Sequence, residues 1–364
     1  MLVSMISRPI AAAAVAIALM AGTGPAQAQE LPDDRIDLIV PYGPGGGSTT
    51  HARLYAPVLE QTLPGNPTIL IRNIDGAGSV VGINQFQQDA KPDGLTFASI
   101  ATGTFFQYIL DNPAVHYDLP AFKPFLASPF GLLVYARKDL GLSGDPVEDI
   151  KHLIENPPVY GGSGATSSDL PALLSIDLLG IEPRYLFGLS NGETRAGLMR
   201  GEIGLNYDNM ASWADAVQPL VEDGTVVPLF TFGFQNEDGE MVRDPMLPEV
   251  PTFLEVYEEI HGEPLSGEAR RVWEALFNIR VMGSKIFVLP PETPQEIVDI
   301  YANAAKEAVA SPEMKSEQAK AIISEYPQST GAAAKRVFDG AMSMTDTERQ
   351  WLKDWLSETH QVEF

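Results

Sequence analysis

Cysteine is absent from the 364-residue sequence, and basic residues are scarce. Without cysteine the protein can form no disulfide, no thiolate metal site and no lipid anchor on an N-terminal cysteine. Lysine and arginine together number 24 against 48 aspartates and glutamates, which gives a formal net charge of −24. That balance argues against nucleic acids and anionic membrane surfaces as partners. The acidic residues are scattered rather than grouped in blocks, which is typical of a solvated surface.

Long hydrophobic runs are also missing, apart from one short stretch near the start of the chain. Arg8 precedes the apolar run Ile10–Met20, and Ala26-Gln27-Ala28 supplies the small residues typical of a cleavage site. We therefore predict a signal peptide of residues 1–28 and an exported mature protein. The alternative is a retained membrane anchor, for which the run is short. The remaining chain, about 335 residues, is long enough to bury a core without disulfides and suggests two lobes.

Strand-like and helix-like segments alternate along this remaining chain. The strand-like segments are residues 36–40, 68–72, 95–100, 132–136, 159–160, 204–207, 226–231 and 286–289. The helix-like segments are residues 51–62, 80–89, 147–155, 169–179 and 332–359, with further helices starting at Thr293, where a capping box is expected, and at Ser311. Such alternation predicts parallel or mixed sheets with helices on both faces.

The most informative segment is Pro41–Thr49, a glycine-rich turn between a strand-like run and a helix-like run. Such a turn presents free backbone N–H groups at the positive end of a helix dipole, a geometry that suits an anion. A nucleotide-binding P-loop is excluded, because Ser48 and Thr49 follow Gly47 directly, without the lysine that a P-loop needs. The alternative is a tight turn that binds no ligand.

Three further turns, residues 76–79, 101–104 and 161–168, are rich in glycine and hydroxyl groups and also fall at the carboxyl ends of strands. Ligands of open α/β sheets bind beyond those ends, so two facing lobes would bring the four turns together. Each hydroxyl in these turns has a second interpretation as a helix cap, and this applies to Ser48, Thr49, Ser79, Thr102 and Thr166.

Two other side chains have two interpretations each. Tyr42 either lines the binding site of an aromatic ligand or belongs to the core. Asp208 follows a strand and either accepts a hydrogen bond from a ligand or caps the next helix.

A secreted serine hydrolase is the alternative from another functional class. Residues 161–165 approximate a nucleophile elbow around Ser163, with alanine in place of the final glycine. An elbow needs a helix directly after the serine, where the sequence indicates a loop, and a downstream histidine, for which only His261 and His360 qualify. The five histidines show no metal-ligand spacing, so we expect neither a metal nor a cofactor.

Five short motifs in a fixed order resemble those of the substrate-binding proteins of tripartite tricarboxylate transporters, also called the Bug family. Ile39–Gly46 is similar to the family's IVPFPPGG, and Asn73–Gly78 with Gly82 is similar to NRPGAGGNIG. The other three are Pro92–Thr96 (PDGYT), Leu247–Thr252 (LPDVPT) and Pro290–Pro294 (PAGTP). The resemblance covers essentially the whole chain after residue 28.

The resemblance implies an α/β periplasmic binding protein of the two-lobed, type II-like "Venus flytrap" kind, with mixed sheets flanked by helices. Residues 29–130 plus 248–364 would form the first lobe, and residues 131–247 the second. Such a protein is not an enzyme. As a monomer, it would capture a small organic acid between its lobes and deliver it to the membrane permease subunits of a tripartite transporter.

On this reading the ligand-binding residues come from both lobes. The first lobe would offer Tyr42, Gly45, Gly46, Gly47, Ser48 and Thr49, with Ser79 opposite and Thr102 and Thr104 at the floor. The second would close with Ser163, Gly164, Ala165 and Thr166, and Asp208 would contact a polar group of the ligand.

The chain also departs from the family pattern. Thr49 stands where the family has an acid that accepts from a ligand amine or hydroxyl, which argues against an amino acid as ligand. Gly204 replaces a common aspartate, and the segment Glu258–Gly283 is longer than usual, with no role that the sequence assigns. The sequence leaves open whether the ligand is a dicarboxylate, a citrate-like acid or an aromatic acid, and whether the protein serves transport or sensing.

Overall fold

The computed structural model describes residues 35–236 and 239–364. The predicted signal peptide, residues 1–28, lies outside these residues. Six strands form the first sheet, in the order β13-β4-β12-β3-β1-β2. They are β1 (Arg35–Val40), β2 (Thr68–Asn73), β3 (Thr96–Ala101), β4 (Lys123–Ser128), β12 (Lys285–Leu289) and β13 (Ser329–Thr330). β1 is parallel to β2 and β3, whereas β12 runs antiparallel to β3 and β4, so the sheet is mixed.

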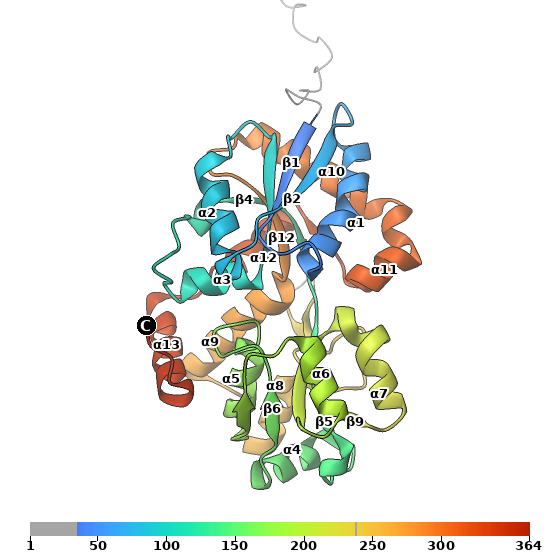
Figure 1. Ribbon diagram of the computed structural model, residues 1–364, viewed down its shortest axis with the longest axis vertical. Coiled ribbons are helices and arrows are strands. Elements are labelled where there is room, and N and C mark those ends of the chain that lie inside the picture. The colour runs from blue at the N-terminus through green and yellow to red at the C-terminus, as the bar shows by residue number, and fades with distance from the viewer. Residues whose placement is uncertain (1–34, 237–238) are drawn as a thin grey trace, which may run out of the picture. The chain divides into compact units, whose positions relative to one another are not determined.

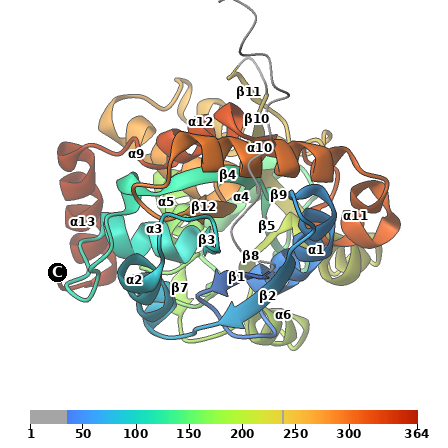
Figure 2. The ribbon, with the colours of Figure 1, turned by 90° about the horizontal axis from the view of Figure 1, so that it is seen from above.

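Helices cover both faces of this sheet (Figure 2). On one face lie α1 (Gly47–Thr62), α10 (Gln295–Ala310) and α11 (Glu317–Ile323); on the other lie α2 (Val80–Asp89), α3 (Thr102–Ile109) and α12 (Ala332–Ala341). The alternation of β1 explains this arrangement, because Ile36, Leu38 and Val40 enter the core beneath α1 while Ile39 packs on the opposite side. Both faces of the central strands are therefore apolar.

The second sheet has five strands in the order β7-β6-β8-β5-β9. They are β5 (Leu132–Arg137), β6 (Val159–Gly161), β7 (Arg184–Leu186), β8 (Leu205–Asn209) and β9 (Val226–Thr231). β6 is parallel to β7 and β8, and β5 is antiparallel to β8 and β9, so this sheet is mixed too. Its helices are α4 (Pro146–Glu155), α5 (Leu170–Leu178), α6 (Asn191–Met199) and α7 (Gln218–Glu222) (Figure 1). An antiparallel pair of short strands, β10 (Phe234–Gln235) and β11 (Met241–Val242), follows β9.

The long segment without an assigned role forms α8 (Phe253–His261) and α9 (Gly267–Phe277). Phe253 packs against Phe230 of β9, with ring centroids 5.8 Å apart. Trp273 of α9 stacks on Phe232 and donates a hydrogen bond to Ser175 Oγ at 2.8 Å. Both helices thus pack on elements of the second sheet. The division into lobes at residues 131 and 247 stays a prediction, and we propose that the second lobe also contains α8 and α9.

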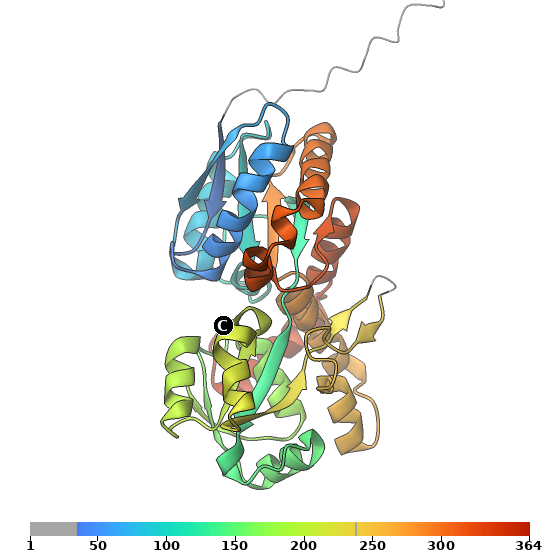
Figure 3. The ribbon, with the colours of Figure 1, turned by 90° about the vertical axis from the view of Figure 1, so that its right-hand side faces the viewer.

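The chain passes from the first sheet to the second between β4 and β5 and returns between α9 and β12 (Figure 3). The return passage is a turn of π-helix, Asn278–Met282, closed by a hydrogen bond from Gly283 N–H to Asn278 O at 2.7 Å. The two passages are bonded to each other, because Phe130 N–H donates to Val281 O at 3.0 Å. We call residues 128–132 and 278–284 the outward and return crossings.

The strand and helix predictions are confirmed to within a few residues, with three differences at helix boundaries. The capping box predicted at Thr293 is wrong, because Pro294 is the N-cap of α10 and Thr293 Oγ1 donates to Pro290 O instead. The segment at Ser311 forms only a 3₁₀ turn before Ser316 caps α11. The tail is broken into α12 and α13 (Asp346–His360), since Thr345 starts a new capping box. None of the helices in the described part of the chain is long and apolar enough to cross a membrane.

Candidate functional site

The turn after β1 places uncapped amides at the start of a long helix. Gly46, in extended conformation, is the N-cap of the 16-residue helix α1 and makes no side-chain capping bond. Its N–H donates to Gly43 O at 3.1 Å, which closes the turn. The first N–H groups of any helix lack an intrahelical acceptor, and Gly45, Gly46 and Gly47 are exposed. The turn therefore offers a helix N-terminus and three accessible glycines to an anion.

Thr49 supports this turn from the inside. Its hydroxyl donates to Gly43 O at 2.9 Å and accepts from Asn73 Nδ2 at 2.7 Å. The same Asn73 amide donates to Tyr42 O, also at 2.7 Å. The buried hydroxyl thus donates and accepts within the protein, and these two bonds hold the glycine turn in place. A contact between Thr49 and a ligand stays a prediction.

Three predicted residues from three separate turns meet in one hydrogen-bonded group. Thr104 Oγ1 donates to Ser79 Oγ at 3.0 Å and lies 3.3 Å from Tyr42 Oη. A Cβ added at Gly103 would lie 3.2 Å from Tyr42 Oη and 3.3 Å from Gly78 O, so glycine allows this close approach. Ser79 holds a left-handed backbone, with φ of 94°, which is a strained conformation for serine. Burial raises the pKa of the Tyr42 phenol, which stays neutral.

The alternative that these hydroxyls cap helices fails for the first sheet. The N-cap residues of α1, α2 and α3 are Gly46, Ser79 and Ala101, and none makes a side-chain capping bond. Thr102, which is buried, is instead the first residue of α3. Thr166 lies in the turn before α5, whose N-cap is Asp169.

The predicted second-lobe turn follows β6 and is organised by a buried carboxylate. Asp169 accepts hydrogen bonds from Tyr160 Oη at 3.0 Å and from Ser163 N–H at 3.2 Å. Burial raises the pKa of Asp169, although these donors oppose the shift. Ser163 is exposed, Gly164 and Thr166 are half-buried, and Ala165 is buried. The backbone N–H of Ser163 therefore stabilises the turn through its bond to Asp169, and the other predicted residues, 164–166, belong to the same turn.

The geometry of a nucleophile elbow is not formed at Ser163. Six residues of turn separate Ser163 from the first residue of α5, Leu170, as the sequence indicated. His261 lies near Leu178 O at 3.2 Å, and His360 packs between the rings of Tyr185 and Trp355. Neither histidine has a described hydrogen bond to Ser163, so the residues of a catalytic triad are not assembled.

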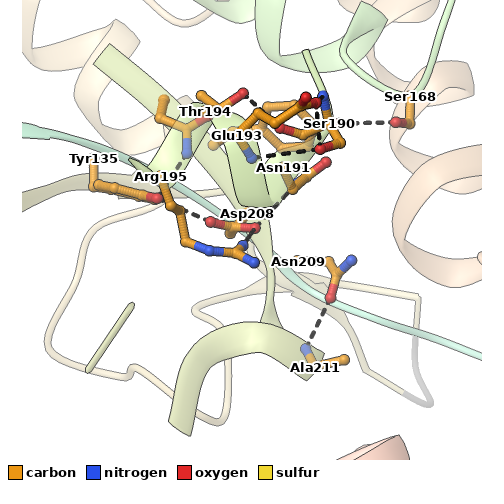
Figure 4. A network of polar contacts seen from close by, with 12 residues as sticks. Tyr135, Ser168, Ser190, Asn191, Glu193, Thr194, Arg195, Asp208, Asn209 and Ala211 are labelled. Atoms are coloured by element: carbon orange, nitrogen blue, oxygen red, sulfur yellow. Dashed lines mark hydrogen bonds and ion pairs between the residues drawn. The ribbon is translucent and has the colours of Figure 1, made fainter. Parts of the chain in front are cut away.

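Asp208, near the end of β8, accepts hydrogen bonds from three side chains of the protein (Figure 4). It accepts from Arg195 Nη1 at 2.6 Å, from Tyr135 Oη at 2.9 Å and from Asn191 Nδ2 at 3.0 Å, and it is 1% exposed. The helical turn that follows is capped by its neighbour Asn209, which accepts from Ala211 N–H. A contact between Asp208 and a ligand stays a prediction; its observed role is to orient two donor side chains of α6.

Two cations that the sequence did not single out lie at the same edge of the first sheet. Lys285 is the first residue of β12 and pairs in register with Ala101 of β3 and Ser128 of β4. Because β12 is antiparallel to its neighbours, it begins where β3 ends. A search confined to the carboxyl ends of strands therefore misses it. The available signal was the pair Arg280 and Lys285, two cations five residues apart in an acid-rich chain.

A series of contacts joins these cations to the second sheet. The guanidinium carbon of Arg280 lies 6.0 Å from the ring centroid of Tyr207 on β8. Tyr207 Oη in turn lies 2.9 Å from Ser168 Oγ, in the turn that carries Ser163 and Thr166. Burial and the neighbouring Arg280 charge lower the pKa of Lys285 to about 7. Within the described residues, no group of three or more His, Asp and Glu side chains has a geometry that could hold a metal ion.

Comparison with known proteins gives relatives along most of the chain, although no family model matches. A UPF0065 protein of Bordetella pertussis is 28% identical over 302 residues, which cover 81% of this chain and 83% of the relative. A UPF0065 protein of Cupriavidus necator is 27% identical over 253 residues, covering 68% and 72%.

Solved structures with the same fold include several solute-binding proteins. A TctC solute-binding protein from Polaromonas, without ligand, matches with a TM-score of 0.64 and 20% identity, covering 90% of this chain and 99% of its own. A Rhodopseudomonas palustris protein with adipate matches with a TM-score of 0.62 and 20% identity, covering 91% and 99%. MatC from the same organism, with bound malate, matches with a TM-score of 0.57 and 20% identity, covering 90% and 98%.

These findings agree with the motifs read from the sequence. The curated relatives are UPF0065 proteins, and the structural neighbours include a TctC solute-binding protein and the periplasmic binding protein BugD. The comparisons thus confirm that this chain resembles the tripartite tricarboxylate, or Bug, solute-binding proteins and has the α/β fold of a periplasmic binding protein, with two mixed sheets flanked by helices.

Proposed function

We propose that the protein is an exported solute-binding protein that captures a small organic acid between two lobes for delivery to a tripartite tricarboxylate-type membrane transporter. The observation that carries this proposal is the uncapped N-terminus of α1, exposed on three glycines and braced by the Tyr42–Thr104–Ser79 group. Amides fixed in this way bind a carboxylate without a long-range positive field, which a chain of charge −24 lacks. Malate and adipate in structural neighbours support an acid as ligand.

In this proposal the glycine turn holds one carboxylate through the amides of Gly45 to Ser48. The turn of Ser163 to Thr166 approaches when the lobes close, and occupancy shifts the population from open to closed. The permease subunits would recognise the closed form. The protein acts in the periplasm as a monomer, after removal of residues 1–28.

A thermal-shift screen of organic acids on residues 29–364 tests the proposal. A true ligand at about a hundredfold excess over its Kd stabilises the folded state by ~2.7 kcal/mol. Malate, adipate, citrate and benzoate serve as probes, with amino acids and neutral sugars as controls. Stabilisation by the controls alone, or by none of the acids, contradicts the assignment.

The variant Gly47→Val, measured in the same thermal-shift screen, tests whether the stabilising acid binds at the glycine turn. A Cβ at Gly47 meets no atom within 4 Å and the backbone needs no positive φ, so the fold tolerates the change. The added side chain covers the amides of the turn, and we expect the affinity for the stabilising acid to fall at least tenfold. Gln61→Val, exposed at the far end of α1, is the matched control and should bind as wild type does.

A further inference from the structure

The return crossing and the first residue of β12 carry two cations, Arg280 and Lys285, that have no acidic partner among the described residues. Arg280 is 5% exposed, and its Nε is buried without a hydrogen-bond partner among the residues described. Its Nη1 reaches Ser284 Oγ only at 3.4 Å, and Lys285 Nζ reaches Ser284 O at the same distance. None of the ion pairs found in residues 35–236 and 239–364 includes either side chain, although acids outnumber bases two to one in the chain.

A structural role alone does not account for this pair. Buried cations in proteins are normally paired, because removing a charge from water is costly. The face of Tyr207 offers Arg280 a weak attraction at 6.0 Å, and the ring of Phe130 lies 5.5 Å from Lys285 Nζ. Neither aromatic ring carries a negative charge. Two neighbouring positive groups with no carboxylate partner among the described residues are suited to bind an anion.

The register of the first sheet puts this pair next to the glycine turn. Lys285 is paired with Ala101 at the end of β3, and β3 lies between β12 and β1. Two strand spacings separate the start of β12 from the end of β1, which is a distance of ~10 Å. An extended lysine or arginine side chain is long enough to span part of that gap. A molecule with anionic groups at both ends can therefore contact the amides of the turn and the two cations together.

We propose that Arg280 and Lys285 form a cationic subsite that binds the second carboxylate of a dicarboxylic or tricarboxylic acid, and so select such acids over monocarboxylates. The inference rests on the proposed function and narrows its substrate class. The first carboxylate sits on the amides of residues 45–48, and the second accepts hydrogen bonds from the guanidinium and the ammonium. Through Tyr207 and Ser168 the subsite also reaches the second sheet, so the ligand's far end lies where both crossings meet.

Titration calorimetry on residues 29–364 at pH 6 tests the subsite with pairs of acids that differ in one carboxylate. Adipate is compared with hexanoate, and malate with 3-hydroxybutyrate. We expect the wild type to bind at least one diacid ten times more tightly than its matched monoacid. Lys285→Met and Arg280→Gln should each weaken that diacid at least tenfold and the monoacid no more than threefold. Arg53→Gln, which removes one exposed cation from α1, should change neither.

The outcomes distinguish a failure of the cationic subsite from a failure of the proposed function on which it rests. If the wild type prefers monocarboxylates, or if both variants weaken mono- and diacids equally, the subsite is disproved while organic-acid capture stands. If no organic acid binds, both fail. Melting temperatures identify any variant that does not fold. In that case two other measurements test the subsite. One is the preference of the wild type for diacids over monoacids. The other is diacid binding by Arg280→Lys, which keeps the charge and should bind the diacid more tightly than Arg280→Gln does.

Discussion

At the scale of single residues, burial determines the protonation of side chains near the strand ends as much as hydrogen bonding does. His51 of α1 is the clearest case. Its Nε2 lies 2.7 Å from Ser128 Oγ, its Nδ1 is buried without a partner in the described chain, and it packs against Tyr55 and Phe287. Burial, with a smaller contribution from the Lys285 charge, lowers the pKa of His51 to about 3.

His51 should therefore weaken the fold in acid. Between pH 6.5 and 3 the unfolded chain binds a proton at this position and the folded chain does not, so stability falls as the pH falls through that window. From pH 6.5 to pH 4 the loss amounts to about 3 kcal/mol. Urea unfolding of wild type and His51→Phe at pH 7, 5 and 4 measures it, because the variant lacks this proton. Parallel pH profiles for the two proteins would show that His51 does not titrate in this way.

At the scale of elements, the two crossings hold the sheets together through close contacts. A Cβ at Gly131 would lie 2.0 Å from Asp244 Oδ2 and 2.2 Å from Tyr326 Oη, so only glycine fits in the outward crossing. Tyr326 donates to the Asp244 carboxylate at 2.8 Å. Burial raises the pKa of Asp244 to about 6, and the stabilisation from this carboxyl is lost as the pH rises through that value.

Gly131→Ala should destabilise the protein by at least about 2 kcal/mol, because overpacking displaces the Asp244–Tyr326 pair. Gly45→Ala is the control, since no atom lies within 4 Å of its added Cβ. Adding Asp244→Ala removes the clashing carboxylate, so the double variant should lose less than the sum of the single losses. Strict additivity in urea unfolding would mean that Gly131 and Asp244 do not interact.

The crossings also show where prediction from sequence stopped. Strand and helix positions such as 80–89 and 226–231 followed from periodicity, and the turns of Tyr42, Ser79 and Thr104 were located because they fall at strand ends. Arg280 and Lys285 were missed because their position depends on β12 running antiparallel, which no local pattern encodes. The donors to Asp208 were equally hidden, since Tyr135 comes from β5 and Asn191 and Arg195 come from α6, two elements that local sequence patterns do not bring to β8.

At the scale of the whole molecule, the charge balance opposes the ligand that the proposed site attracts. A net charge of −24 repels a dicarboxylate at long range, and salt screens this repulsion because the Debye length shrinks from ~30 Å at 0.01 M to ~8 Å at 0.15 M. We expect the association rate constant of a bound diacid to rise several-fold over that range, measured by stopped-flow fluorescence. A rate that falls with added salt would mean that the local cations, rather than the overall charge, govern the approach.

The location of the cation pair has an evolutionary consequence. Arg280 and Lys285 belong to one eight-residue segment, residues 278–284 with the first residue of β12, and not to the glycine turn that would hold the first carboxylate. Substitutions confined to that segment can change the preferred ligand charge and leave the amide cradle intact. Paralogues with this fold can therefore acquire different ligand specificities through substitutions in a single short segment.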